Sequence, residues 1–324
     1  MNSRRRLCLV SLFAVLCGWS AAATGEEYPA RPIDMVIGLS PGAATDIGAR
    51  LIGKEAEKTL GREFVPINKP GGGGAVAAGV VANSRADGYT LLATVSATLT
   101  NVPHMESVSY KPLEDLVPVF QFGLLVPAFV VRADSPYKTM KDVIDAARKN
   151  PGKISFGIPG PGTSPDVLAQ LLALREKVDI AIVPFGGSAP IIAALLGGHV
   201  TVGGVSTPSV VAQVKAGAVR AIATTGAKRA DGLSEVATLV EQGYPYGTME
   251  EMFLFAVPKG TPKPIVDKLE AAFRKAAAGN EYKTKAKTMY MYPESPLSGS
   301  RLSGWVKDQY TANGAIIKKA DIGK

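Results

Sequence analysis

Short apolar runs rich in β-branched residues alternate with helical patterns along the first two thirds of the chain. The runs lie at 33–37, 63–67, 89–95, 128–131, 153–156, 179–183, 200–202 and 219–224. Each is followed by a turn, and most turns lead into a helical pattern. Strands that alternate with helices at this spacing form parallel sheets covered by helices. The alternation therefore predicts an α/β fold, and a chain of 324 residues suits two medium domains.

Several helices carry their own boundary signals. Residues Ile47, Leu51, Ile52 and Leu60 lie on or near one face of a helix that stops at Gly61. Thr139, with Asp142 three residues on, predicts a capped helix that ends before Pro151. The C-terminal third differs, since a strand at 252–257 is followed by helices at 262–279, around 281–289 and from about 297 onward. We expect this helical block to pack back on the first domain.

Three turns lead from a strand into a helix and share small residues: Ser40–Asp46, Pro159–Ser164 and Phe185–Ser188. A helix N-terminus presents unpaired N–H groups and partial positive charge, which together attract an anion. Small side chains also let a ligand approach the backbone. Each turn could instead only reverse the chain, with Asp46 complementing the helix dipole. The set favours a protein that grips a small anion and does not transform it.

The N-terminus predicts export. Arg4–Arg6 form a basic start, Leu7–Leu16 is too short an apolar run to span a membrane, and Ala21–Ala23 offer a cleavage site. Residues 1–23 thus read as a secretory signal peptide, with lipoprotein and twin-arginine export as weaker alternatives. Cleavage removes both cysteines and leaves 33 basic residues against 28 acidic ones, a net charge of +5. This mild excess favours anionic ligands.

Other familiar sites lack their parts. The glycine run at 70–75 matches a nucleotide motif, but no acidic residue ends the next strand, so tight helix packing is favoured. His104 and His199 lie far apart with no ligand spacing for zinc and no Ser-His-Asp signature. No cofactor or metal is indicated. Nucleic acid is not indicated either, because no basic run follows Arg4–Arg6 and aromatic residues are sparse.

An ordered series of motifs resembles the bacterial extracytoplasmic solute receptors of the tripartite tricarboxylate transporter system, the Bug-type receptors. The series spans nearly all of the mature chain, and its order is more specific than any single motif. Its members are YPARPI at 28–33, PGAATD at 41–46, NKPGGGG at 68–74, ADGYTLL at 86–92, YKPLEDL at 110–116, PGK at 151–153, VPFGGSAP at 183–190, LLGGHV at 195–200, KAG at 215–217, RAIA at 220–223 and AVPKGTP at 256–262.

The resemblance implies a two-lobed type II periplasmic binding-protein fold with a ligand cleft between the lobes. Lobe one would comprise 24–124 plus 252–324, and lobe two 125–251. One carboxylate of a small organic acid would be held between the first turn and loops of the second lobe. The residues implied by position are Ala43, Ala44, Thr45, Asp46, Ser96 and Thr98 in lobe one, and Gly162, Thr163, Ser164, Gly187 and Ser188 in lobe two.

The chain departs from the family pattern around the expected pocket. Ala43 replaces the usual second glycine of the first turn, and Ser40 stands where proline is common. In lobe two, Asp166 replaces a common histidine, Gly186 replaces a common lysine, and Val205-Ser206 replaces Asp-Asn. The carboxylate grip is retained, whereas contacts to the far end of the ligand are altered.

The leading hypothesis is a periplasmic receptor, not an enzyme, that captures a small carboxylate by lobe closure and delivers it to the membrane permease subunits of a tripartite tricarboxylate-type transporter. A binding protein that reports to a sensor kinase is the nearest alternative. A periplasmic enzyme is a third, for which only Asp46 or Asp166 could serve as a general base. The sequence does not identify the acid.

Overall fold

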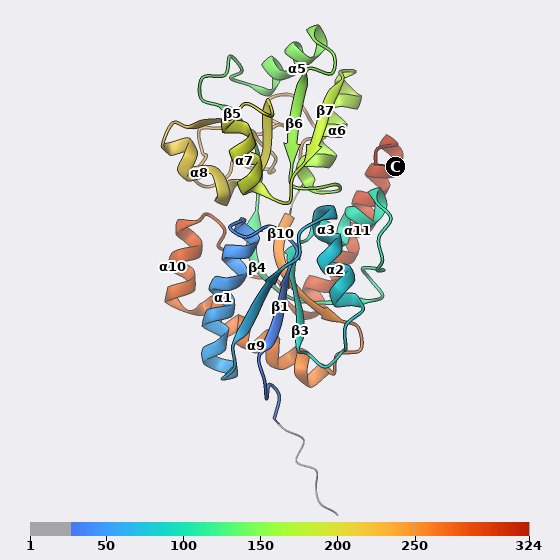
Figure 1. The fold of residues 1–324 in the computed structure, drawn as a ribbon, viewed down its shortest axis with the longest axis vertical. Coiled ribbons are helices and arrows are strands. Elements are labelled where there is room, and N and C mark those ends of the chain that lie inside the picture. The colour runs from blue at the N-terminus through green and yellow to red at the C-terminus, as the bar shows by residue number, and fades with distance from the viewer. Residues whose placement is uncertain (1–26, 250, 324) are drawn as a thin grey trace, which may run out of the picture.

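The computed structural model describes residues 27–249 and 251–323. The predicted signal peptide lies outside the described residues. Within them the chain forms two five-stranded sheets, each covered by helices on both faces, and the two resulting lobes are stacked end to end (Figure 1). The predicted α/β class is therefore observed, and the arrangement of the two sheets decides where a ligand can sit.

The first sheet has the order β2-β1-β3-β10-β4. β1 runs parallel to β2 and β3, whereas β10 is antiparallel to β3 and β4. The C-terminal helices cover this sheet together with helices from the N-terminal part. Its elements are β1 (Ile33–Ile37), α1 (Ala44–Leu60), β2 (Phe64–Asn68), the short 3-10 helix η1 (Gly72–Gly74), α2 (Ala75–Ala82), β3 (Thr90–Val95), α3 (Ala97–Thr100), α4 (Val102–Met105), β4 (Leu116–Leu125), β10 (Glu251–Pro258), α9 (Lys263–Ala278), α10 (Asn280–Thr288) and α11 (Gly299–Ala320).

The second sheet has the order β7-β6-β8-β5-β9, with β6 parallel to β7 and β8 and β5 antiparallel to β8 and β9. α5 and α6 pack on one face, and α7 and α8 on the other. The elements are β5 (Pro127–Arg132), α5 (Met140–Lys149), β6 (Ile154–Ile158), α6 (Ser164–Glu176), β7 (Ile180–Pro184), α7 (Ser188–Leu196), β8 (Val202–Ser206), α8 (Thr207–Lys215) and β9 (Val219–Thr224).

The chain crosses between the two sheets twice. Only Val126 separates β4 of the first sheet from β5 of the second, and the return runs from β9 to β10. A further link comes from α11, whose C-terminal end rises beside the second lobe (Figure 1), where Ile317 and Ala320 join the core under α6. The helical block therefore packs on the first lobe as expected but also reaches the second. The exact lobe boundaries remain a prediction.

The structure corrects the sequence analysis in three details. Each sheet is mixed and not wholly parallel, because β10 and β5 enter from the other lobe in the opposite direction. β4 was not predicted at all. In α1, Ile47 is exposed, and the buried stripe consists of Ala49, Ile52, Ala56 and Leu60, at the three- and four-residue spacing of one helix face. The Thr139–Asp142 capping box is present as predicted.

Candidate ligand site between the lobes

Two turns with the same backbone geometry stand at corresponding places in the two lobes. The turn at 41–46 follows β1 and the turn at 161–166 follows β6, and both open with Pro-Gly and close with Asp. Gly42 and Gly162 have φ values of 79° and 74°, which glycine adopts without a side-chain clash. In each turn the glycine N–H donates to the aspartate Oδ2, at 3.0 Å for Asp46 and 2.8 Å for Asp166. Each carboxylate therefore stabilises the turn to which it belongs.

Each turn leads into a helix whose N-cap residue makes no side-chain capping bond, Ala43 for α1 and Thr163 for α6. α1 has 17 residues and α6 has 13, so both carry a substantial dipole. Their opening N–H groups have no intrahelical acceptor. Thr45, in the first turn of α1, is only 1% exposed, and its Oγ1 has no hydrogen-bond partner. A buried hydroxyl in that state is a ready donor or acceptor for a bound group.

A cavity of about 20 Å³ lies where these helix starts meet. Its wall includes Ala43, Ala44 and Thr45 from lobe one, and Thr163 and Ser188 from lobe two. The remaining lining residues are Leu39, Val95, Leu125, Pro127, Pro159, Pro165, Ser206, Glu251 and Phe253. A single water needs roughly 10–15 Å³, so the cavity has room for little more than one water. The two lobes are therefore closed on each other.

Direct contacts hold the closed arrangement. The backbone N–H and the Oγ of Ser40 both donate to the Gly186 carbonyl across the cleft, each at 3.0 Å. A Cβ on Gly160 would lie 2.6 Å from the Gly73 nitrogen, so the two backbones touch there. The glycine run at 71–74, expected to serve helix packing, thus also lets the lobes approach each other.

Glu251 is a charged residue of the cavity wall that the sequence analysis did not predict. It begins β10, is 6% exposed, and accepts a hydrogen bond at 3.0 Å on Oε1 from the backbone N–H of Ser164, the first residue of α6. Burial raises its pKa to about 7, against the opposing effect of hydrogen bonds from Ser164. A carboxylate of the protein itself therefore occupies the start of one helix at the cavity. The only sequence signal was a charged residue opening a strongly apolar strand.

The structure divides the eleven predicted contact residues into two groups. Five line the cavity: Ala43, Ala44, Thr45, Thr163 and Ser188. The other six do not: Asp46, Ser96, Thr98, Gly162, Ser164 and Gly187. Among these, Ser96 Oγ accepts from the Met252 N–H at 3.1 Å, and Thr98 Oγ1 donates to the Gly73 carbonyl at 2.8 Å. These two hydroxyls support the lobe-one backbone, and contact with a ligand stays a prediction for all eleven.

The two aspartates considered as general bases serve the turns. Asp46 accepts from Arg50 Nε at 2.8 Å and from Asn68 Nδ2 at 2.9 Å, in addition to the Gly42 N–H. Asp166 accepts from Gln170 Nε2 at 2.9 Å, and burial raises its pKa. Neither residue lines the cavity. Their geometry is that of structural acids.

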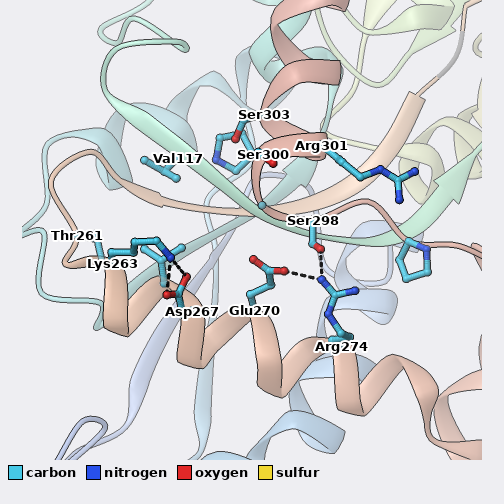
Figure 2. Close-up of a pocket in the computed structure, with 14 residues that line it drawn as sticks. Val117, Thr261, Lys263, Asp267, Glu270, Arg274, Ser298, Ser300, Arg301 and Ser303 are labelled. Carbon is cyan, nitrogen blue, oxygen red and sulfur yellow. Dashed lines mark hydrogen bonds and ion pairs between the residues drawn. The ribbon is translucent and has the colours of Figure 1, made fainter.

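A larger, open groove of about 660 Å³ lies on lobe one between α9 and the start of α11, and its polar side chains face one another (Figure 2). Lys263 pairs with Asp267, and Arg274 pairs with Glu270 and donates to Ser298. Four of the five charged side chains that line the groove are therefore paired with each other, and Arg301 is the fifth. The groove is also remote from the paired turns, which favours the inter-lobe cavity as the candidate site.

Among the residues that the structure describes, no cluster of three or more His, Cys, Asp or Glu side chains could hold a metal ion. None of the helices in residues 27–249 and 251–323 combines the length and apolar character that crossing a membrane requires.

Comparison with solved structures identifies the architecture. The periplasmic binding protein BugD superposes with a TM-score of 0.85 at 29% identity, covering 92% of this chain and 100% of BugD. MatC from Rhodopseudomonas palustris, solved with bound malate, gives a TM-score of 0.84 at 27% identity, covering 90% of this chain and all of MatC. The predicted two-lobed binding-protein fold is therefore confirmed.

Sequence comparison points to the same group of proteins as the solved structures. Protein BugT of Bordetella pertussis is 34% identical over 269 residues, which is 82% of each chain. The family model for the tripartite tricarboxylate transporter family receptor matches residues 48–322. Because that family and the solved neighbours are binding proteins, the prediction of a binding protein in place of an enzyme is confirmed. With its fold and most of its length matched in this way, the chain belongs to the tripartite tricarboxylate transporter receptor family.

Proposed function

We propose that the mature protein is a periplasmic receptor that captures a small carboxylate between its lobes and delivers it to a tripartite tricarboxylate-type membrane permease. The observation that carries the proposal is the convergence of α1, α6 and α7 on one cavity. Helix starts from opposite lobes, together with the buried Thr45 hydroxyl, offer hydrogen bonds and partial positive charge to an anion. The malate bound to the related MatC supports a carboxylate as the ligand class.

Capture by closure follows from this geometry. In an open molecule the helix starts of the two lobes would separate, and a carboxylate bound to one lobe would lack the donors of the other. The closed state alone lets both sets of donors reach the anion, so the ligand shifts the population toward closure. Each charge-assisted hydrogen bond contributes about 1.5–3 kcal/mol. The Ser40–Gly186 bonds add support that does not depend on the ligand.

Calorimetry and thermal shift across a panel of mono-, di- and tricarboxylates, amino acids and aromatic acids test the ligand class. A ligand at about 100 times its Kd should add about 2.7 kcal/mol of stability. Ala44→Asp puts a carboxylate at the first position of α1, in the cavity wall, and should weaken binding at least ~100-fold by charge repulsion and bulk. Asn280→Asp makes the same kind of change at the exposed start of α10 and should leave affinity unchanged. No response to any acid would contradict the proposal.

Export and partner need cellular measurements. Mass spectrometry of the periplasmic fraction should find a mature chain that begins after Ala23. Cross-linking of the ligand-loaded receptor in cells should capture permease subunits. Capture of a sensor kinase in their place would favour the signalling alternative, and a chain retained in the cytoplasm would contradict both.

A further inference from the structure

When ionised, Glu251 brings a negative charge to a site otherwise built to attract anions. Three helix starts face the cavity, and each carries about half a positive charge. The glutamate offsets most of their sum. Among the described residues that line the cavity there is no lysine, arginine or histidine to balance a second anionic group. One ligand carboxylate can be accommodated, but a second has no positive partner in the wall.

The place of Glu251 fixes which helix start remains for the ligand. Its carboxylate already accepts the Ser164 N–H at the start of α6. The start of α1, with the unpartnered Thr45 Oγ1, has no such occupant. At the third start, that of α7, Ser188 Oγ already accepts the Ser206 N–H. A ligand carboxylate therefore belongs at α1, and the remainder of the ligand extends toward Glu251.

Glu251 also forms part of a neighbouring pocket of about 370 Å³, which it shares with Leu125. Three charged residues of the loop after β9 line that pocket: Lys228, Arg229 and Asp231. Arg229 pairs with Glu241 at 3.0 Å, and Lys228 is exposed to solvent. Glu251 thus lines both the inter-lobe cavity and this neighbouring pocket, so a ligand that extends from α1 into the second would contact it.

We propose that Glu251 is a specificity-determining residue that selects carboxylates bearing a cationic or hydrogen-bond-donating second group, such as zwitterionic amino acids, over dicarboxylates of the same length. The inference rests on the proposed function. A buried carboxylate stabilises an ammonium group that faces it, whereas a second buried carboxylate is repelled and has lost its hydration. The ligand's own carboxylate would contact α1 in either case. The contacts of the two classes of ligand therefore differ only at the second group, which faces Glu251.

Isothermal titration at pH 8 with matched ligands tests the inference. For each length from three to six carbons, the series contains a monocarboxylate, its α-amino and ω-amino derivatives, and the dicarboxylate. For the length that binds best, we expect an amino derivative to bind the wild type at least ~10-fold more tightly than the dicarboxylate. Glu251→Gln keeps an acceptor for the Ser164 N–H but removes the charge, and should reduce this preference at least ~10-fold. Glu235→Gln, an exposed glutamate, is the matched control.

The outcomes separate the two proposals. A dicarboxylate that binds the wild type as tightly as its amino counterparts overturns the role of Glu251, even if the receptor hypothesis stands. A preference for amino derivatives that survives in both Glu251→Gln and Glu251→Met also overturns it, and the second variant covers a folding failure of the first. Absence of binding by every carboxylate to the wild type rejects the proposed function itself, and this inference with it.

Discussion

The turns at 41–46 and 161–166 have the same backbone but different surroundings. In the first, Asp46 pairs with Arg50, which is partly exposed, and no other carboxylate of the described residues occupies the start of α1, which stays open to a ligand. In the second, Asp166 is buried against the neutral Gln170, and the start of α6 already holds Glu251. Local sequence therefore reproduces a helix start that suits an anion, but only the tertiary environment decides whether that start is free.

The same contrast separates the two carboxylates that lie near the start of α6. Asp166 lies behind its turn and serves the backbone, whereas Glu251 lies at the cavity wall and arrives from a strand of the other sheet. Both have a raised pKa because of burial. Only the second position changes what the cavity can accept.

The largest effect is expected for the stability of Glu251→Gln. The pKa of Glu251 is raised from 4.5 to about 7 in the folded protein. This group's contribution to the free energy of unfolding is therefore fully present below pH 4.5 and is lost as the pH rises toward 7 and above. Removal of the titrating group should therefore make the variant more stable than the wild type at pH 8, by up to about 3 kcal/mol.

Urea unfolding at pH 5 and pH 8 measures this difference. The gap between variant and wild type should be small at pH 5 and should widen with pH, while Glu235→Gln should follow the wild type at both. A gap that stays constant with pH, or that reverses sign, would show that Glu251 does not titrate in the buried environment described.

The second effect concerns the glycines of the paired turns. A Cβ at Gly42 meets nothing within 4 Å, whereas a Cβ at Gly162 would lie 2.6 Å from Val102 Cα in the opposite lobe. Both alanine variants carry the left-handed strain of about 1–2 kcal/mol. Gly162→Ala adds a clash that opening of the lobes relieves, so it should weaken ligand affinity ~10-fold or more beyond Gly42→Ala.

Calorimetry on both variants, paired with thermal unfolding of the ligand-free proteins, separates closure from folding. Comparable loss of stability with unequal loss of affinity would support the assignment of the clash to the closed state. Equal affinities for the two variants would mean that ligand-bound lobes do not approach as closely as described.

The sequence supplied the fold where its signals were local. β-Branched runs, turn chemistry and helix caps located most strands and helices within a few residues. β4 was missed because Pro118 and Gly123 interrupt its apolar run. The proline is tolerated there because β4 lies at the edge of its sheet, where one side of the strand needs no partner.

The candidate site was only partly predictable for a related reason. Ala44 and Thr45 line the cavity, as expected from a turn motif that folds locally. Glu251 reaches Ser164 from 87 residues away in the sequence, and no local pattern reports that approach. Thr98 follows a strand, a position at which ligand contacts are expected, but its hydroxyl donates to the Gly73 carbonyl in the glycine run. Long-range contacts decided these two assignments, of Glu251 and of Thr98.

A smaller effect distinguishes the two turn aspartates. Asp46→Asn leaves Arg50 without its carboxylate and should cost about 1 kcal/mol. Asp166→Asn removes a charge that burial already disfavours and keeps an acceptor for Gly162, so its stability at pH 8 should remain within about 0.5 kcal/mol of the wild type. Chemical denaturation at pH 8 measures both. A greater loss for Asp166→Asn would place the more important structural charge in the second lobe.

The smallest effect compares one hydroxyl from each turn. Thr163 Oγ1 donates to the Gly160 carbonyl at 2.7 Å, whereas Thr45 Oγ1 has no partner. Thr163→Val should destabilise the ligand-free protein by about 1 kcal/mol because it removes a buried hydrogen bond. Thr45→Val removes an unsatisfied polar group and should stabilise it by up to about 1 kcal/mol, yet lower ligand affinity. Thermal unfolding and calorimetry on the same samples detect these opposite signs. A Thr45→Val protein that is less stable than the wild type, or that binds the ligand as tightly, would mean that this hydroxyl is not an unpartnered group that binds the ligand.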